Sequence, residues 1–243
     1  MKHLLLLGAK SDIAKALAKE YASHGYHLIF AGRQIQELSD FANELQLKYN
    51  VSVELIHFDV LDFNSHPSFF NDLSTKPNGV ICCVGYLGNQ DLAMQNPKES
   101  LLILNTNFIG CVTILDQFAS YFEQIKQGFI IGISSVAGDR GRKSNYFYGS
   151  AKAGFTAYLS GLRARLFSKN VHVLTVKPGF VYTKMTAHLV LPKPLTIYPD
   201  VLAEKVYKGH QKKKNVVYIK WIWKYIMWVI RFIPEFIFKK MNL

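Results

Sequence analysis

The chain has few of the residues that mark a disulfide-rich, metal-binding or disordered protein. Its 243 residues include three cysteines, two of them adjacent, and no C-x-x-C spacing. That set cannot build a disulfide framework, so we expect buried thiols in a reducing compartment. The eight histidines show no ligand spacing, which argues against a metal site. A hydrophobic content of 49% excludes intrinsic disorder, and ordinary glycine and proline counts exclude a collagen-like chain.

Acidic residues are also scarce, 17 against 29 Lys and Arg, which leaves a net charge of +12. From Asp200 to Leu243, ten basic residues face three acidic ones, a local net charge of +7. The same segment is rich in Trp, Phe and Ile, so it favours an anionic lipid surface, whereas no nucleic-acid-binding motif is present. The N-terminus has only four leucines before Gly8, too few for a secretory signal, so we expect a cytoplasmic location.

Short apolar runs alternate with helical periodicity along most of the chain, and the length fits one domain. The expected strands are His3–Leu7, Tyr26–Ala31, Val51–Phe58, Gly79–Val84, Phe129–Ile133, Val171–Val176 and Val216–Ile219. The expected helices are Asp12–Ser23, Gln34–Tyr49, Phe63–Leu73, Pro97–Phe122, Tyr146–Phe167 and Asp200–His210, with a loop over Tyr182–Pro199. Nearly continuous apolar strands separated by helices predict an α/β fold, a doubly wound, Rossmann-like parallel sheet over residues 1–219.

The first strand runs into a turn at Gly8–Ala14 that opens a helix. A dinucleotide fold needs small residues there, because the backbone must approach the pyrophosphate at the helix N-terminus. Only Gly8 is a glycine, while Asp12 and Ala14 stand at the other two glycine positions, so the motif alone is weak. We expect Asp12 to cap the helix, because its carboxylate would repel a phosphate.

The end of the second strand bears on which cofactor fits. An NAD site usually has an acid about 20 residues after the glycines, to bind the ribose 2′-hydroxyl. This chain has Ala31-Gly32-Arg33 there, so a 2′-phosphate is the better partner, and Lys10 could add charge. We therefore expect NADP(H) in preference to NAD(H); the alternative is that Arg33 is a solvated surface arginine.

Later in the chain, Ser135, Tyr148 and Lys152 suggest chemistry at a carbonyl group. Tyr148 and Lys152 are four residues apart, so one helical face presents both, and Ser135 ends the fifth strand. A tyrosine hydroxyl is an ordinary acid at neutral pH, and a nearby ammonium favours its ionised form. The pair could therefore donate or accept a proton at a carbonyl oxygen. The Tyr-x-x-x-Lys spacing is common by chance, so it needs its context.

That context resembles the short-chain dehydrogenase/reductase family from His3 to about Ile219. The residues that carry the resemblance are, in chain order, Gly8, Arg33, Asp59, Asn107 within Asn-Phe-Ile-Gly, Ser135, Tyr148, Lys152 and Pro178-Gly179 with Thr183. The resemblance implies a catalytic tetrad of Asn107, Ser135, Tyr148 and Lys152. It also implies that Lys152 holds the nicotinamide ribose and that Asn107 positions a water in the proton relay.

The residue patterns and the resemblance together predict one cofactor site. Its members are Gly8, Lys10, Ser11, Asp12, Ile13, Arg33, Asp59, Val60, Gly85, Lys152, Pro178, Gly179, Val181 and Thr183. By the resemblance, Asp59 would hold the adenine and Thr183 the nicotinamide carboxamide. The chain has Cys82-Cys83-Val84-Gly85 where the family has Asn-Asn-Ala-Gly, which leaves open how this turn is supported.

The turn at Gly8 and the basic, aromatic C-terminus further resemble reductases of 2-keto pentoses carried on a polyprenyl phosphate, which act at membranes. The family usually pairs through two long helices, so the resemblance implies a homodimer or homotetramer.

The segment Lys220–Leu243 contains no helix breaker before Pro234. On a helix, Lys220, Lys224 and Arg231 share a narrow stripe, and nearly all other positions are apolar. The segment is too short and too charged to span a bilayer. Four aromatic residues suit the membrane interface, namely Trp221, Trp223, Tyr225 and Trp228. We expect the segment to bind an anionic membrane surface; the alternative is burial against a partner subunit.

The charged loop Asp139–Lys143 lies between Ser135 and Tyr148. It is either a solvated loop or a place where basic residues meet a phosphate on the substrate.

Three hypotheses for the function follow. The first is an NADPH-dependent reductase of a lipid-linked ketosugar or keto-lipid, peripheral at the inner face of the membrane. The second is a soluble carbonyl or 3-oxoacyl reductase whose tail forms an oligomer, and the third is an NADP-sensing binding module without turnover.

Overall fold

A computed structural model of the protein describes residues 1–241. Seven parallel strands form one sheet in the order β3-β2-β1-β4-β5-β6-β9. They are β1 (Lys2–Leu7), β2 (Tyr26–Gly32), β3 (Val53–His57), β4 (Gly79–Cys82), β5 (Gly128–Ile133), β6 (Val171–Pro178) and β9 (Val216–Ile219). The strand order reverses beside β1, so the expected doubly wound parallel sheet is confirmed.

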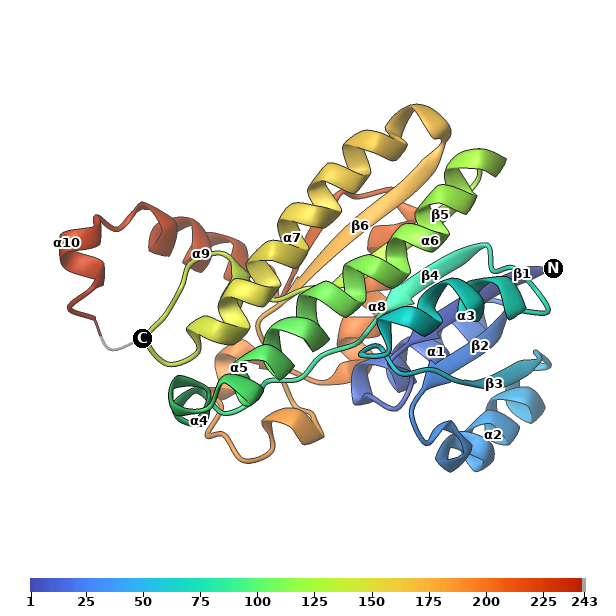
Figure 1. Cartoon of the computed structure of the whole chain (residues 1–243), viewed down its shortest axis with the longest axis horizontal. Coiled ribbons are helices and arrows are strands. Elements are labelled where there is room, and N and C mark those ends of the chain that lie inside the picture. Colours follow the sequence, from blue (N-terminus) through green and yellow to red (C-terminus); the bar gives the residue numbers. More distant parts are fainter. Residues whose placement is uncertain (242–243) are drawn as a thin grey trace.

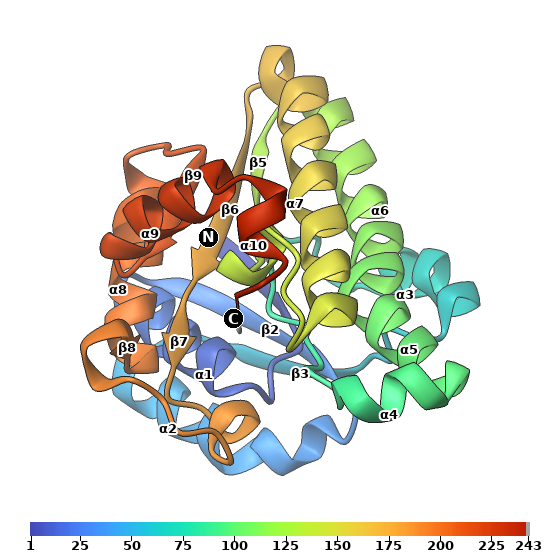
Figure 2. The same cartoon turned by 90° about the vertical axis from the view of Figure 1, so that its left-hand side faces the viewer.

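Helices cover both faces of the sheet. They are α1 (Asp12–Ser23), α2 (Ser39–Tyr49), α3 (His66–Asp72), α4 (Gln90–Gln95), α5 (Pro97–Leu104), α6 (Gly110–Ile125), α7 (Tyr146–Leu166), α8 (Pro199–Gln211), α9 (Ile222–Phe232) and α10 (Glu235–Phe238). Figure 2 shows α6 and α7 to the right of β5 and β6, and α8 to their left. In β1, Leu4 and Leu6 belong to the core beneath α1 and α8, whereas Leu5 and Leu7 belong to the core beneath α6 and α7. Burial on both faces is why the strands contain nearly continuous apolar runs.

Three expected helices differ in detail. The helix expected over Phe63–Leu73 is a 3₁₀ turn at Phe63–Ser65 followed by α3. The helix expected over Pro97–Phe122 is α5 and α6 joined by a π-turn at Asn105–Ile109, and the run ends at Ile125. This run is long and apolar enough to cross a bilayer by composition, but Ile114, Phe118 and their neighbours pack in the core beside the sheet. The helix expected from Gln34 begins as a 3₁₀ turn, because Gln34 has a left-handed backbone. Helix α4 was not predicted.

The segment Tyr182–Pro199 is mostly loop, as expected. It holds two 3₁₀ turns and a short strand, β8 (Thr196–Ile197), which pairs with β7 (Phe180–Val181). Figure 1 shows α9 and α10 at the left of the molecule. The last two residues of the expected C-terminal extension, Asn242 and Leu243, lie outside the described part of the chain.

Candidate active site

The four candidate catalytic residues come from three elements beyond the carboxyl ends of the central strands. Ser135 follows β5, Tyr148 and Lys152 lie in the first two turns of α7, and Asn107 lies in the π-turn. The Lys152 Nζ atom is 5.7 Å from the centre of the Tyr148 ring. A Cβ atom added to Gly85 would lie 3.5 Å from Asn107 Oδ1 and 3.8 Å from Lys152 Nζ. The fold therefore brings together residues that are up to 45 positions apart in the sequence.

Lys152 is a buried cation, with 2% of its surface exposed. Its ammonium donates to the carbonyl oxygens of Ile133, at 3.2 Å, and Val84, at 3.4 Å. No carboxylate pairs with it among residues 1–241. Burial weakens screening by water, so a charge at this position acts more strongly on its surroundings than an exposed one would.

Ser135 is held against α7 by contact between the two backbones. Its Oγ accepts a hydrogen bond from the Ala137 N–H at 3.1 Å, which opens a 3₁₀ turn. A Cβ on Gly138 would lie 2.7 Å from the Ala153 nitrogen, so only glycine allows this approach. The neighbouring Ser134 Oγ donates to the Lys152 carbonyl at 3.1 Å. The Ser135 segment and the Tyr148–Lys152 turn thus form one rigid unit.

Asn107 supports the turn at Cys82–Gly85. The sequence had left open how this turn is supported. Its amide nitrogen donates to the carbonyl oxygens of Tyr86 at 2.6 Å and Ile103 at 2.8 Å, and its Oδ1 accepts from the Tyr86 N–H at 3.1 Å. A π-turn shifts the helical bonding pattern, and the side chain takes up the Ile103 carbonyl. The side chain is fully buried. These bonds make Asn107 a positioning residue for the Val84–Tyr86 backbone.

The cysteines of that turn are structural. Cys82 is fully buried, and its hydrogen bond with Cys111 lowers the pKa of its thiol, whereas burial raises the pKa of Cys83. The Cys83 N–H donates to the Leu7 carbonyl at 2.9 Å, which ties the turn to β1.

The turn at Gly8–Ala14 has the conformation that a dinucleotide site needs, with one correction. Gly8 has a φ of +76°, and a Cβ there would lie 2.9 Å from the Val84 nitrogen, so glycine is required. The N-cap of α1 is Ser11, whose Oγ accepts from the Ala14 N–H at 3.1 Å, so the expectation for Asp12 was wrong. Ser11 caps the helix because its extended backbone lets its own hydroxyl reach the third N–H of the helix.

Asp12 instead joins the start of α1 to the turn that follows Thr183. Its Oδ2 accepts from the Lys184 N–H at 2.7 Å, which draws the Thr183–Thr186 turn towards the start of α1. The N–H groups of Asp12 and Ile13 lie in the first turn, where a helix has no acceptors of its own.

Of the two residues expected to bind a 2′-phosphate, one has an ion-pair partner and the other has none among the described residues. Arg33 is exposed, follows β2 directly, and forms no ion pair within the described residues. Lys10 lies beside the same loop, but Glu37 binds its ammonium at 2.7 Å and Gln34 accepts from it at 3.1 Å. Arg33 is therefore the free cation at this position, and the charge of Lys10 is already matched.

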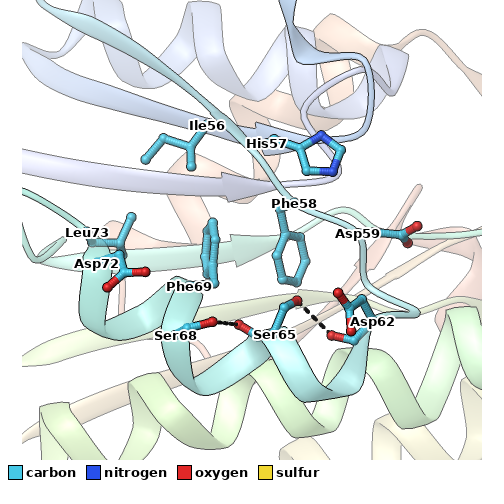
Figure 3. Close-up of a pocket in the computed structure, with 10 residues that line it drawn as sticks. All are labelled: Ile56, His57, Phe58, Asp59, Asp62, Ser65, Ser68, Phe69, Asp72 and Leu73. Atoms are coloured by element: carbon cyan, nitrogen blue, oxygen red, sulfur yellow. Dashed lines mark hydrogen bonds between the residues drawn. The ribbon is translucent and has the colours of Figure 1, made fainter.

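Asp59 lies at the carboxyl end of β3, on the rim of a cavity of about 270 Å³ beneath α3. Figure 3 shows the ring of Phe58 between Phe69 and the Asp59 carboxylate. Asp59 Oδ1 accepts from the Leu61 N–H at 3.0 Å. Buried Val60 packs against Gly110, at the start of α6. The cavity is lined by none of the four candidate catalytic residues.

The segment after β6 is packed against the C-terminal helix. A Cβ on Gly179 would lie 1.8 Å from Trp223 Nε1, so the indole sits directly on this glycine, beside Pro178. Val181 is buried in β7, and the Thr183 backbone N–H donates to the Thr186 hydroxyl at 3.2 Å. Trp223 is 4% exposed, so its expected place at a membrane interface was wrong.

Asp139 and Arg140, the first two residues of the charged loop, fix the segment between Ser135 and Tyr148. The Asp139 carboxylate pairs with buried Lys177 and accepts from the Tyr218 hydroxyl at 2.8 Å. Burial, and after it this hydrogen bond, raises the pKa of Tyr218. The Arg140 guanidinium donates to the carbonyl oxygens of Ile230 and Ile233, each at 2.6 Å. Asp139 and Arg140 are therefore not in a solvated loop. The sequence signal for these contacts was a group of charged residues next to apolar ones. It did not identify the partners of Asp139 and Arg140, because those partners are distant in the sequence.

These residues fit a bound dinucleotide. A glycine turn, a helix N-terminus with free N–H groups, a free arginine after β2 and a buried lysine at Gly85 line the carboxyl edge of the sheet, where nucleotides bind in doubly wound folds.

The sequence and the fold of this chain are similar to those of known proteins. A family model described as short chain dehydrogenase matches residues 2–193. An uncharacterised oxidoreductase of Mycobacterium tuberculosis is 31% identical over 241 residues, 98% of this chain and 96% of that protein. An NADP-dependent 3-hydroxy acid dehydrogenase of Schizosaccharomyces pombe is 26% identical over 231 residues, 89% of each protein. A solved short-chain dehydrogenase from Sphingobium yanoikuyae in complex with NADPH has a TM-score of 0.83 at 20% identity, covering 97% of each chain.

Proposed function

We propose that this chain, which belongs to the short chain dehydrogenase family and is an NAD(P)-dependent oxidoreductase, reduces a ketone to an alcohol with NADPH. The observation that carries the proposal is the buried, unpaired Lys152 ammonium 5.7 Å from the Tyr148 ring, in one rigid unit with Ser135. NADPH would supply the hydride when bound.

The chain's own residues would handle the proton and the developing charge. Tyr148 would donate its hydroxyl proton to the carbonyl oxygen, and Ser135 would donate a hydrogen bond to that oxygen as it becomes negative. Lys152 would stabilise the phenolate that remains, because its ammonium is buried and unpaired. Asn107 would keep the Val84–Tyr86 backbone in place through its three hydrogen bonds.

The test of this chemistry is Tyr148→Phe, which removes only the hydroxyl. We expect NADPH oxidation against a ketone panel to fall by several powers of ten, with NADPH affinity within about twofold of wild type. Ser135→Ala serves as a second variant, with a smaller expected loss. Equal rates in the Tyr148→Phe and wild-type proteins would reject Tyr148 as the proton donor, and no turnover with any ketone would favour the NADP-sensing module.

The cofactor preference rests on the loop after β2. Arg33 is a free cation there, whereas no acidic side chain follows the strand directly. A guanidinium binds a phosphate well and gains little from a ribose hydroxyl. The NADP-dependent relative and the NADPH-bound structure support the same preference.

We further propose that the protein acts at an anionic membrane surface on a lipid-linked ketosugar or keto-lipid. Helix α9 buries Trp223 and Met227 against the domain and exposes the opposite side. We name the exposed side, continued onto α10, the aromatic face; it consists of Trp221, Tyr225, Trp228, Phe232 and Phe236, each 59–72% exposed. Exposed Lys224, Arg231, Lys239 and Lys240 border it, and this charge suits anionic headgroups.

The segment that carries the aromatic face is hydrogen-bonded to the loop Lys184–Pro199. Trp223 Nε1 donates to the Leu195 carbonyl at 3.1 Å, and the Lys220 ammonium donates to the Pro194 carbonyl. A lipid-linked ketone could therefore enter past Lys184–Pro199 while α9 rests on the membrane.

Flotation with liposomes tests the membrane proposal. Truncation at Lys220 would expose the Trp223 site, so point substitutions are preferable. We expect Trp228→Ser/Phe232→Ser to abolish flotation with anionic liposomes, whereas Leu47→Ser/Phe167→Ser, also strongly exposed, should leave it unchanged. An intact protein that never floats but forms an oligomer sensitive to Trp228→Ser would instead assign the aromatic face to a subunit interface.

A further inference from the structure

A cavity of about 330 Å³ lies at the amino end of the sheet, opposite the candidate active site. It is formed by residues at the start of β1, β2, β5 and β6 and by the last turn of α8. None of the residues predicted to bind the cofactor or to act in catalysis lines it. The cavity is therefore large enough for a small molecule and separate from the site at the carboxyl end.

The cavity has positive charge and no carboxylate. Its charged residues are Lys2, at the start of β1, and Lys213, just before β9. Neither lysine forms an ion pair within residues 1–241. Strands β4, β5 and β6 lie between β1 and β9, so the two charges enter from different sides. This arrangement suits a ligand with two separate acidic groups better than a single compact anion.

Asn78 adds a neutral hydrogen-bond donor whose orientation is fixed. Its Oδ1 accepts from the His3 backbone N–H at 2.7 Å, so the other side of the amide is the NH₂ group. That group forms no hydrogen bond in the part of the chain that the structure describes. Because Asn78 lines the cavity, its free N–H groups are available to a ligand.

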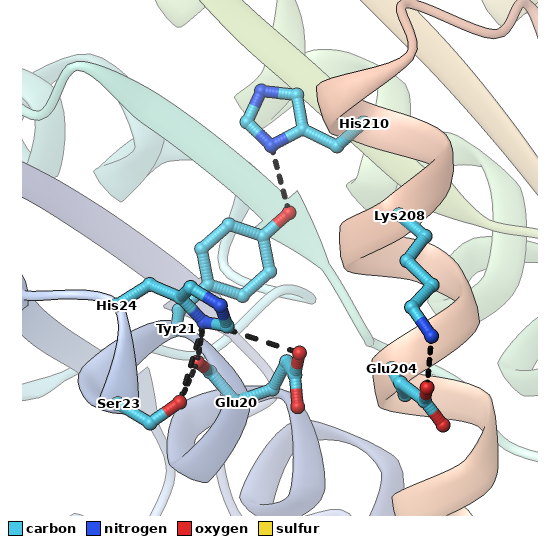
Figure 4. Close-up of polar contacts among 7 residues, drawn as sticks. All are labelled: Glu20, Tyr21, Ser23, His24, Glu204, Lys208 and His210. Atoms are coloured by element: carbon cyan, nitrogen blue, oxygen red, sulfur yellow. Dashed lines mark hydrogen bonds and ion pairs between the residues drawn. The ribbon is translucent and has the colours of Figure 1, made fainter.

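His210 offers a second neutral donor. Burial lowers its pKa to about 4, so the ring is neutral at pH 7. The buried Tyr21 hydroxyl lies 3.0 Å from His210 Nδ1 (Figure 4) and has no other acceptor among the described residues, so it donates to Nδ1. The ring proton is therefore on Nε2, which forms no hydrogen bond within residues 1–241.

His172 provides an acceptor instead. Its Nε2 is 2.9 Å from the Lys214 carbonyl oxygen, which can only accept, so the ring proton is on Nε2. Burial lowers the pKa of this ring too, which keeps it neutral at pH 7. Nδ1 is left as a buried acceptor without a hydrogen-bond partner among the described residues. An unsatisfied buried acceptor is unfavourable, and a ligand hydroxyl would satisfy it.

We propose that this cavity binds a small dicarboxylate that carries a hydroxyl group. The carboxylates would bind the two lysine ammonium groups and would accept from Asn78 and His210. The hydroxyl would donate to His172 Nδ1. An ammonium group on the ligand would donate there too, but it would add positive charge to a cavity that is already positive. Binding here would not depend on the proposed reductase activity, because the cavity is at the other end of the sheet.

Calorimetry on the full-length protein without cofactor tests the proposal with two matched probes. Citramalate is a dicarboxylate with one tertiary hydroxyl, and methylsuccinate lacks only that hydroxyl. A tertiary alcohol has no hydrogen on the carbon that carries its hydroxyl, so hydride transfer cannot oxidise citramalate at the reductase site. We expect citramalate to bind at least about fivefold more tightly, because only its hydroxyl can satisfy His172.

Two double variants test the charges. Lys2→Gln/Lys213→Gln changes only exposed side chains, so it should fold normally and lose at least about tenfold in affinity for both probes. Lys212→Gln/Lys214→Gln removes the same charge from exposed neighbours that do not line the cavity, and its affinities should stay within about twofold of wild type. Equal losses in the two variants would show that the probes respond only to the general positive charge, and would overturn the site.

Two single variants test the neutral groups. His172→Phe keeps a ring but removes the acceptor, so the affinity for citramalate should fall to that for methylsuccinate, which itself should change by less than about twofold. Asn78→Asp keeps an oxygen for the His3 N–H but replaces the donor with a carboxylate oxygen, so both probes should bind at least about tenfold more weakly. A wild-type protein that binds the two probes equally, or that binds inorganic phosphate more tightly than citramalate, would overturn the proposed ligand class.

Discussion

At the residue scale, Lys152 is distinguished by its burial together with the absence of a carboxylate partner. Two lysines are buried in the described part of the chain; Lys177 pairs with Asp139, whereas Lys152 pairs with no carboxylate in residues 1–241. A buried charge without a counter-ion costs folding free energy, so Lys152 indicates a functional position. Arg33 also lacks a carboxylate partner, but it is exposed, so its place directly after β2 is what suggests a contact with the cofactor.

Arg33→Ala tests the cofactor assignment at this scale. We expect the KM for NADPH to rise by about tenfold or more, equivalent to about 1.4 kcal/mol, while the KM for NADH changes little, because only NADPH has the 2′-phosphate. Steady-state kinetics with both cofactors gives the two values. Lys10→Ala is the matched control and should have a smaller effect, since Glu37 already binds that ammonium. A uniform change in both KM values would contradict a specific contact with the 2′-phosphate.

At the scale of elements, helix α9 has apolar residues on two sides. One side packs against the domain, and the other is exposed. Trp223 and Met227 are one turn apart and pack with Val136 and Phe180, next to the Ser135 turn and Gly179. The aromatic face is on the other side. The helix therefore joins the exposed surface to the segments that follow β5 and β6, which is how a membrane contact could lie so close to the chemistry.

Gly179→Ala tests the contact between α9 and the segment after β6. The added methyl would overlap the Trp223 indole, so we expect a loss of about 1–3 kcal/mol in the free energy of unfolding. Urea denaturation measures the change. Gly161→Ala, within α7 and with nothing near its added methyl, should instead stabilise the protein by up to about 1 kcal/mol. If both variants behaved alike, the tight packing of Trp223 on Gly179 would be wrong.

At the scale of the whole molecule, the two ends of the sheet differ in chemistry. The carboxyl end holds the candidate site and the cationic, aromatic C-terminus. The amino end holds a buried aromatic cluster in which the Tyr21 hydroxyl hydrogen-bonds His210 Nδ1 at 3.0 Å (Figure 4). Burial, with a smaller contribution from His172 and Lys2, lowers the pKa of His210 to about 4.

This shift predicts a loss of stability in acid. The native protein keeps His210 neutral down to about pH 4, whereas the unfolded chain takes up the proton near pH 6.5. The free energy of unfolding should therefore fall as the pH drops from 6.5 towards 4, by at most about 3 kcal/mol from this residue. Burial lowers the pKa of His3, His66 and His172 as well, which adds to the effect in the same direction.

Urea denaturation at pH 7.5 and pH 5 measures the dependence. His210→Gln should flatten it, because the amide does not titrate. His188→Gln, at an exposed loop position, should keep the wild-type slope. A His210→Gln protein with an unchanged slope would show that the acid sensitivity arises elsewhere.

The sequence by itself determined the architecture and the local part of the site. Strands buried on both faces have nearly continuous apolar runs, and the four-residue spacing of Tyr148 and Lys152 fixes their shared helix face. These signals act over one strand or one helical turn, so they can be read without knowing the partners.

Only the tertiary structure decided which residues meet across long separations. Arg140 finds Glu235 95 residues away, and Asp12 binds the Lys184 backbone 172 residues away, which leaves the cap of α1 to Ser11. Trp223 has the same composition signal as its neighbours, yet it is buried because Gly179 leaves room for it. Such choices depend on packing in three dimensions, where a side chain's free energy is set by neighbours that its local sequence does not contain.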